Sequence, residues 1–141
     1  MNWLIFAILS ALSFGFYNFF TKLSADKFSP AVAIMVLTGT AFLVSLVTVL
    51  ALQLTGHPLN FSKNWIILPI LAGLFAGAAE ISYVFMFAKN APLSIGNPLV
   101  VGGTIIVAVA LGIIFLKEPL SAIKTAGIAL TLGGLLLLAR S

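Results

Sequence analysis

One acidic side chain, Glu80, lies in the middle of a hydrophobic stretch of this 141-residue chain. The other two acidic residues, Asp26 and Glu118, fall between hydrophobic stretches. A charge at the centre of a lipid-spanning helix costs roughly 2.5–3.5 kcal/mol on insertion scales, so such residues usually face a protein interior or a water-filled cavity. A carboxyl group that leaves water also favours its neutral form. Glu80 is therefore our first candidate for a proton or substrate site, and a structural hydrogen bond is the alternative.

A polar stripe follows helical spacing along the first hydrophobic stretch, since residues three and four apart share a helix face. The stripe comprises Ser10, Ser13, Tyr17, Asn18 and Thr21. An asparagine in lipid leaves several hydrogen-bonding sites to satisfy, which favours a cavity-facing role for Asn18 and its neighbour Tyr17. Ser13 is a further candidate, although small hydroxyl groups also form hydrogen bonds to a neighbouring helix. Tyr83 adjoins Glu80 and could present its ring to a cation, with ordinary packing as the alternative.

The fourth hydrophobic stretch contains the residues that most readily interrupt a helix. Asn97 and Pro98 come about one turn from its start, and Gly102 and Gly103 follow. Proline frees a backbone carbonyl and glycines loosen a helix, so we expect a bend or an unwound turn here. Interrupted helices often mark the binding region or the gate of a transporter. The alternative is that Pro98 occupies the first turn without a kink.

Glycines at helical spacing predict two surfaces for helix packing. Gly73 and Gly77 form a small-xxx-small pair in the third stretch, which lets another helix approach closely. Gly127 and Gly134 lie with Thr131 along one side of the fifth stretch. We assign this second surface to the interface with another helix of the bundle or with a second copy.

The residues that enzymes and metal sites need are absent or scattered. The sequence has no cysteine, which excludes disulfides and thiolate ligands. His57, its one histidine, lies between the second and third stretches with no acidic residue near it in sequence, so no metal-ligand spacing is found. The lysines stand singly at the ends of stretches, as membrane-interface anchors do, and do not indicate a nucleic-acid binder. We therefore expect no enzyme activity, no metal and no cofactor.

Five hydrophobic stretches must position these candidates. Hydrophobic residues make up 62% of the chain and charged residues 7%, whereas soluble domains carry about 25% charged residues. A bilayer core about 30 Å thick needs about 20 helical residues. The sequence thus predicts an all-α polytopic integral membrane protein that forms a single transmembrane domain over residues 1–141. The predicted spans are residues 3–21, 30–54, 66–88, 93–116 and 123–139.

The loops between the stretches give almost no bias for orientation, which the lysines and arginines of short loops normally set. Five spans place the two termini on opposite sides of the membrane. The side of the N-terminus carries Lys63, Lys117 and Lys124. The other side carries Lys22, Lys27, Lys89 and Arg140. Either other causes fix one orientation, or copies insert both ways and pair as an antiparallel homodimer. Such a pair would reproduce the inverted repeats on which many transporters are built.

A glycine-rich pattern closes the chain. The fourth stretch ends in Gly112-Ile-Ile-Phe-Leu-Lys-Glu118-Pro-Leu-Ser, and the fifth contains Gly127-Ile-Ala-Leu-Thr-Leu-Gly133-Gly-Leu-Leu-Leu-Leu. This pattern resembles one EamA repeat of the drug/metabolite transporter superfamily. Most members of that family have two such repeats in tandem. The resemblance therefore implies that two copies of this single repeat form a dimer that rebuilds the complete transporter.

We expect a small-solute membrane transporter of the prokaryotic plasma membrane that works by alternating access as a homodimer, with proton coupling through Glu80. Its partners would be a small-molecule substrate, the lipid bilayer and a second copy of the chain. The alternative is a non-transporting scaffold or regulatory subunit of a larger complex, in which Glu80 would form a helix–helix hydrogen bond. A passive channel would need a continuous polar lining, which the sparse polar stripes hardly provide.

Overall fold

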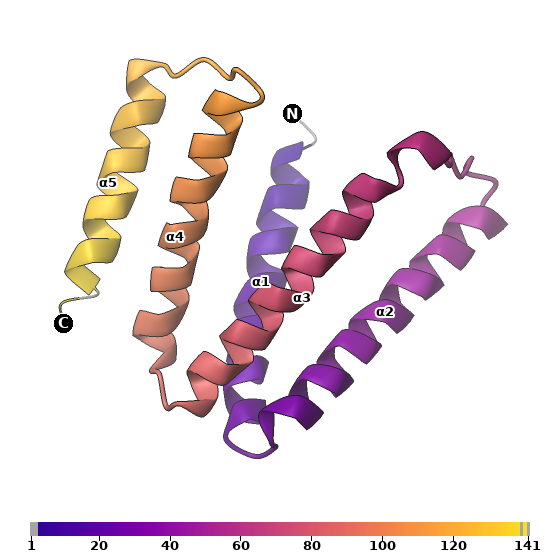
Figure 1. Cartoon of the computed structure of the whole chain (residues 1–141), viewed down its shortest axis with the longest axis horizontal. Helices are drawn as coiled ribbons and strands as arrows, with labels where there is room; N and C mark the ends of the chain where they lie inside the picture. Colours follow the sequence, from indigo (N-terminus) through magenta and orange to yellow (C-terminus); the bar gives the residue numbers. More distant parts are fainter. Residues whose placement is uncertain (1–2, 139, 141) are drawn as a thin grey trace. The chain divides into compact units, whose positions relative to one another are not determined.

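The computed structural model describes residues 3–138 and residue 140. These residues form five α-helices and one short 3-10 helix, and they contain no strand (Figure 1). The helices are α1 (Trp3–Ala25), α2 (Pro30–Leu54), η1 (Lys63–Trp65), α3 (Ile67–Ala88), α4 (Leu93–Ile114) and α5 (Ala122–Leu138). The predicted all-α class is confirmed, and the helix bounds follow the predicted spans closely.

The helices are apolar enough for a bilayer, and most are long enough to cross one. Four segments qualify by length and composition, namely α1, α2, η1 with α3, and α4. Helix α5 is equally apolar in character but has 17 residues, slightly fewer than the about 20 that a bilayer core requires. Residue 139, the predicted end of the last span, lies outside the described residues.

The backbone explains where the helices begin and end. Pro30 opens α2 after the extended Ser29, and proline suits a first helical position because its missing N–H has no intrahelical partner there. Gly56 and Asn90 adopt left-handed conformations, with φ of 76° and 64°, just beyond α2 and α3. Glycine, and to a lesser degree asparagine, tolerates that conformation, so both helices stop at these points.

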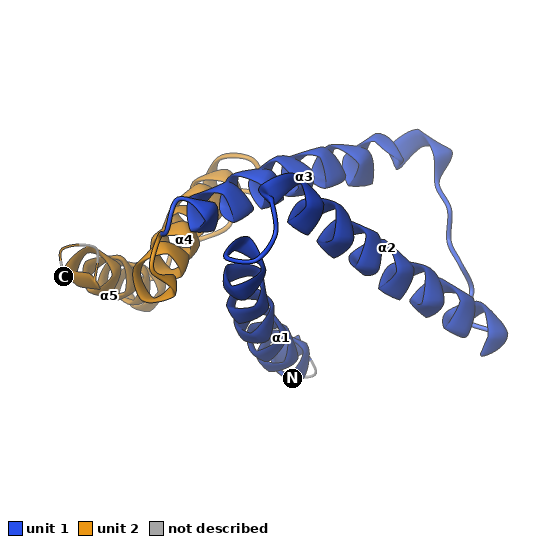
Figure 2. Cartoon of the chain, turned by 90° about the horizontal axis from the view of Figure 1, so that it is seen from below, with its two compact units in different colours: residues 1–90 blue, residues 91–141 orange. Residues whose placement is uncertain are grey.

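The chain divides into two compact units, residues 1–90 and residues 91–141 (Figure 2). The first unit contains α1, α2 and α3, and the second contains α4 and α5. The single domain expected from the sequence stays a prediction.

In the first unit, α3 packs against both α1 and α2. Its contact face consists of residues at helical spacing: Val84 and Phe87 are fully buried, and Tyr83 is 8% exposed. Helix α1 contributes its last two turns to the core, whereas Ala33 is the one described residue of α2 that is buried. The other apolar side chains of these helices are largely exposed, as is expected of helices whose solvent is lipid.

Gly73 and Gly77 lie outside this core. A Cβ atom added at either position would meet no described atom within 4 Å. The buried residues of α3 lie in its second half, so neither α1 nor α2 approaches these glycines closely. Their packing role therefore stays a prediction for contacts beyond this chain.

In the second unit, α4 packs against α5. Gly102 allows this contact, because a Cβ there would lie 2.5 Å from Leu135 Cδ1. Gly127 and Gly134 of α5 have open space around them in the described chain. The glycine that the sequence assigned to a gate thus lies in the α4–α5 contact, and the packing role assigned to the two α5 glycines stays untested.

Helix α4 continues without interruption through Pro98, Gly102 and Gly103. The unwound turn expected from the sequence is therefore not found in the described helix. Pro98 is also not in the first turn, since α4 begins at Leu93. A membrane helix tolerates an internal proline, which removes one backbone hydrogen bond, when neighbouring elements support the helix. Whether this segment works as a gate stays a prediction.

Candidate functional site

The contact between α1 and α3 joins two of the predicted site residues, which are 63 positions apart in sequence. The Tyr17 hydroxyl donates a hydrogen bond to Glu80 Oε2. Glu80 precedes Tyr83, Val84 and Phe87 by three, four and seven residues, so helical spacing places all four on the face that packs against α1. The same packing that buries the apolar residues therefore carries Glu80 to Tyr17.

The second carboxylate oxygen of Glu80 has a different environment. Glu80 Oε1 is buried and has no hydrogen-bond partner among the described residues. Most buried polar atoms in proteins are hydrogen-bonded, and an exception calls for an explanation. Leaving such an atom unpaired costs about 1–3 kcal/mol. An oxygen in this position can accept a proton or a hydrogen-bond donor without breaking the contact that Oε2 makes with Tyr17.

Aromatic rings surround the pair. The rings of Tyr17 and Tyr83 stack with centroids 6.3 Å apart and planes inclined by 11°. Phe14 meets Tyr17 edge-on at 6.0 Å, and Phe87 meets Tyr83 at 4.8 Å with an interplanar angle of 73°. These neighbours lower the local polarity around Glu80, and the faces of the two tyrosines are surfaces that attract cations.

One cation approaches this aromatic cluster. Lys22 Nζ lies 5.9 Å from the centroid of the Phe87 ring and 3.0 Å from Asp26 Oδ1. Asp26 therefore balances the charge of Lys22. Tyr17 and Tyr83 lie beside the Glu80 carboxyl group. Both side chains are uncharged in their ordinary states.

The remaining predicted site residues, Asn18, Ser13 and Asn97, differ in burial and position. Asn18 is 9% exposed and lies on α1 next to Tyr17 in sequence. Ser13, although it belongs to the same stripe, is exposed. Asn97 is half-buried on α4, in the other compact unit. The structure thus brings Glu80, Tyr17 and Tyr83 together, and the binding roles of all six residues stay predictions.

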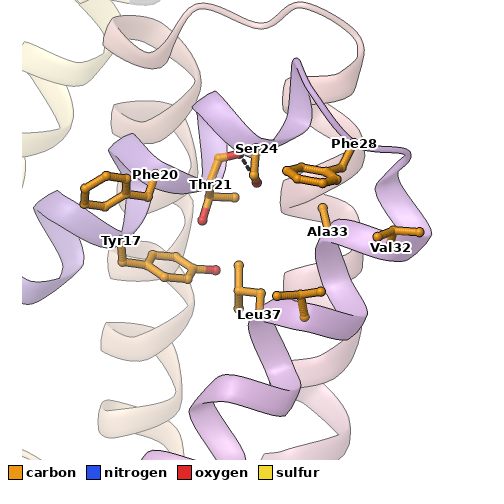
Figure 3. A pocket seen from close by; sticks show the side chains of 9 residues that line it. Tyr17, Phe20, Thr21, Ser24, Phe28, Val32, Ala33 and Leu37 are labelled. Carbon is orange, nitrogen blue, oxygen red and sulfur yellow. Dashed lines mark hydrogen bonds between the residues drawn. The ribbon is translucent and has the colours of Figure 1, made fainter.

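Sequence reasoning gave no separate role to Thr21, a member of the polar stripe. Its side chain is 2% exposed, and its hydroxyl oxygen has no hydrogen-bond partner in the described part of the chain. Thr21 also lines a cavity of about 240 Å³ between α1 and α2 (Figure 3). The spacing of four residues from Tyr17 placed Thr21 on the correct face. The cavity itself had no signal in the sequence, because its α2 wall is made of ordinary aliphatic residues.

The described residues contain no group of three or more histidine, cysteine, aspartate or glutamate side chains that could hold a metal ion. The chemistry available to the α1–α3 site is therefore that of one carboxyl group, a phenol that donates to it and the aromatic faces around them. Such a set can bind a proton or a hydrogen-bonding or cationic group.

Comparison with known protein families assigns the chain to one of them. The model of the EamA-like transporter family matches residues 1–140. The searches of curated proteins and of solved structures gave no match. Because the family model covers almost the whole sequence, the chain belongs to the EamA-like transporter family. The resemblance noted in the sequence is thereby confirmed, and the long apolar helices agree with an integral membrane protein.

Proposed function

We propose that this member of the EamA-like transporter family carries a small solute across the prokaryotic plasma membrane by alternating access, with Glu80 as the group that binds a proton or the solute. One observation carries the proposal: the carboxyl group of Glu80 is held by Tyr17 through Oε2, while Oε1 is buried without a partner among the described residues. A residue that serves only to join two helices would be expected to satisfy both oxygens.

The chemistry of a buried carboxyl group supports coupling. A carboxyl group can bind either a proton or a cationic group, and Oε1 of Glu80 has no other partner among the described residues. Binding of one excludes the other, because both neutralise the same charge. Glu80 would then exchange a proton for a cationic solute, which is the elementary step of an antiporter. The stacked rings of Tyr17 and Tyr83 would provide the aromatic surface for that solute.

We further propose that the transporter is an antiparallel homodimer. Support comes from the near-equal numbers of lysine and arginine residues on the two sides of the predicted topology. The chain holds a single five-helix repeat, and transporters of this kind place their site between two related halves. The open surfaces at Gly73 and Gly77 offer positions where a helix of the second copy could approach closely.

Transport into vesicles tests the role of Glu80. The purified chain is reconstituted with a pH-sensitive dye inside the vesicles, and amino acids, sugar-like metabolites and organic cations are added outside in turn. We expect a solute-dependent pH change that Glu80→Gln abolishes, because the amide can still accept a hydrogen bond from Tyr17 but cannot bind a proton. Glu118→Gln is the matched control, since Glu118 lies in the α4–α5 connection.

Two outcomes would contradict this function. If Glu80→Gln leaves the solute flux and its pH dependence unchanged, Glu80 is not the coupling residue. If the folded protein moves none of the three solute classes faster than empty vesicles do, the alternative of a non-transporting scaffold gains support. In that case the hydrogen bond between Tyr17 and Glu80 would be a structural link between α1 and α3.

A further inference from the structure

The cavity between α1 and α2 is lined by uncharged side chains, most of them apolar. Its lining residues are Tyr17, Phe20, Thr21, Ser24, Phe28, Val32, Ala33, Val36 and Leu37. Figure 3 shows Tyr17 and Thr21 of α1 facing Ala33 and Leu37 of α2, with the Phe28 ring near one end. None of these described lining residues carries a charge. The walls therefore suit an uncharged, mostly apolar body, whereas the carboxyl group of Glu80 suits a proton or a cation.

The hydroxyl groups in this wall differ in how they are paired. Tyr17 donates to Glu80, and Ser24 donates to the backbone carbonyl of Thr21 at 2.9 Å. The Thr21 hydroxyl oxygen, by contrast, is buried and forms no hydrogen bond of ordinary length among the described residues, although the Tyr17 hydroxyl is its polar neighbour. Because Thr21 is 2% exposed, bulk water does not satisfy this hydroxyl either. A bound molecule with a hydrogen-bonding group would remove the cost of leaving it unpaired.

The cavity is open on one side, so its volume gives the size of the part of a molecule that fits inside it. An apolar cavity of about 150 Å³ accommodates benzene, so by simple scaling about 240 Å³ holds a molecule of about ten non-hydrogen atoms. A bilayer acyl chain could lie against the same apolar side chains. It has no polar atom within its hydrocarbon part, however, and would leave the Thr21 hydroxyl unpaired. The unpaired hydroxyl therefore favours a small amphiphile over a lipid chain.

We propose that the α1–α2 cavity binds a small uncharged solute with an apolar body of about ten non-hydrogen atoms and one hydrogen-bonding group, which pairs with the Thr21 hydroxyl. This site is separate from the carboxyl group of Glu80, although Tyr17 forms part of both. The inference does not depend on proton coupling, because it concerns binding and not transport.

Equilibrium dialysis against the full chain in lipid nanodiscs tests the proposal, with empty nanodiscs as the background. The probes are 2-phenylethanol, which has an aromatic body and one hydroxyl group, and propylbenzene, in which a methyl group replaces that hydroxyl. We expect saturable binding of 2-phenylethanol above the background. Thr21→Val, which keeps the shape of the side chain, should weaken that binding about five-fold, as loss of one hydrogen bond does.

Stability provides a second readout that a merely structural threonine would not give. Without probe, Thr21→Val should unfold at the same temperature as the unmodified chain or at a higher one, because it removes an unpaired buried hydroxyl. Thr38→Val is the matched control: the Thr38 hydroxyl donates to the Ile34 carbonyl at 2.8 Å on the exposed surface of α2. It should leave probe binding unchanged. Val36→Phe fills the cavity and should abolish saturable binding.

The proposal is overturned if propylbenzene binds as tightly as 2-phenylethanol and Thr21→Val changes neither affinity, since the cavity would then be a groove for lipid chains. It is also overturned if neither probe binds above empty nanodiscs while the chain remains folded. Loss of proton coupling in Glu80→Gln, with unchanged binding of 2-phenylethanol, would support two separate sites. The proposed transport can therefore be disproved while binding in the α1–α2 cavity is confirmed, and binding can be disproved while transport is confirmed.

Discussion

The hydrogen bond between Tyr17 and Glu80 links a side chain of α1 to a side chain of α3. A carboxyl group in a low-polarity site is costly when its last partner is removed, whereas loss of both partners together costs less. The stability of single and double variants should therefore be strongly non-additive. This expectation concerns the folded state and does not depend on whether Glu80 binds a proton during transport.

We predict that Tyr17→Phe lowers the free energy of unfolding by about 1–3 kcal/mol, because it removes the hydrogen bond that Glu80 Oε2 accepts while Oε1 stays unpaired. Glu80→Leu combined with Tyr17→Phe should cost less than the sum of the two single changes. Equilibrium unfolding of the purified protein in detergent measures all three variants. Effects that add within about 0.5 kcal/mol would show that the two side chains are energetically independent.

At the residue scale, sequence periodicity predicted which side chains share a helix face but not which face meets another. Tyr17 and Asn18 follow from the polar stripe, and Tyr83 follows from its distance to Glu80. The pairing of Tyr17 with Glu80 depends on the contact between α1 and α3, for which helical spacing contains no information. Thr21 was on the stripe too. Its unpaired state follows only from the neighbours that bury it.

The helices themselves were the most predictable part, because a bilayer fixes both their length and their apolar character. Prolines and short basic segments marked the boundaries, as at Pro30. Of the bend or unwound turn expected at Pro98, the described α4 shows no unwound turn, and the bend stays a prediction. Local sequence predicts what a proline disfavours, but it does not show which helix lies beside this segment, as α5 does through Leu135 at Gly102. The packing partner of a glycine is likewise a tertiary property.

The contact of α4 with α5 leads to a prediction about two adjacent glycines. An added Cβ at Gly102 would lie 2.5 Å from Leu135 Cδ1, whereas one at Gly103 would meet no described atom within 4 Å. Both Gly→Ala changes gain the same helix propensity. We therefore expect Gly102→Ala to be about 1–3 kcal/mol less stable than Gly103→Ala, because Leu135 must move. Unfolding in detergent measures the difference, which Leu135→Ala should remove.

Helix α3 has a packed face and an exposed face, and two phenylalanines report on them. Phe87 is fully buried, whereas Phe85 is 47% exposed. Truncation of a buried phenylalanine costs about 3–5 kcal/mol, because contacts are lost and a cavity remains. We expect Phe87→Ala to lower stability by that amount and Phe85→Ala to cost far less. Similar losses for both would mean that the exposed face of α3 is also packed, against a second copy or another protein.

At the scale of the whole molecule, the balance of charges decides how the chain inserts. The three lysines predicted on the side of the N-terminus face four basic residues on the other side, and such a small difference leaves both orientations accessible. The chain contains no cysteine, so single introduced cysteines can report on orientation without background. Ser29 and Ser62 are suitable positions, because they lie on opposite predicted sides and neither forms a side-chain cap.

We predict that Ser29→Cys and Ser62→Cys are each labelled by a membrane-impermeant maleimide in only part of the molecules in intact cells, because copies insert both ways. Lys117→Gln with Lys124→Gln leaves Lys63 as the one lysine on its side. The positive-inside tendency should then move Ser62→Cys to the outside in nearly all copies and protect Ser29→Cys. The matched pair Lys117→Arg and Lys124→Arg keeps the charges and should change neither labelling.

Complete labelling of one site and complete protection of the other, with all lysines present, would establish a single orientation. An antiparallel dimer could then not form, and two copies could rebuild only a parallel pair.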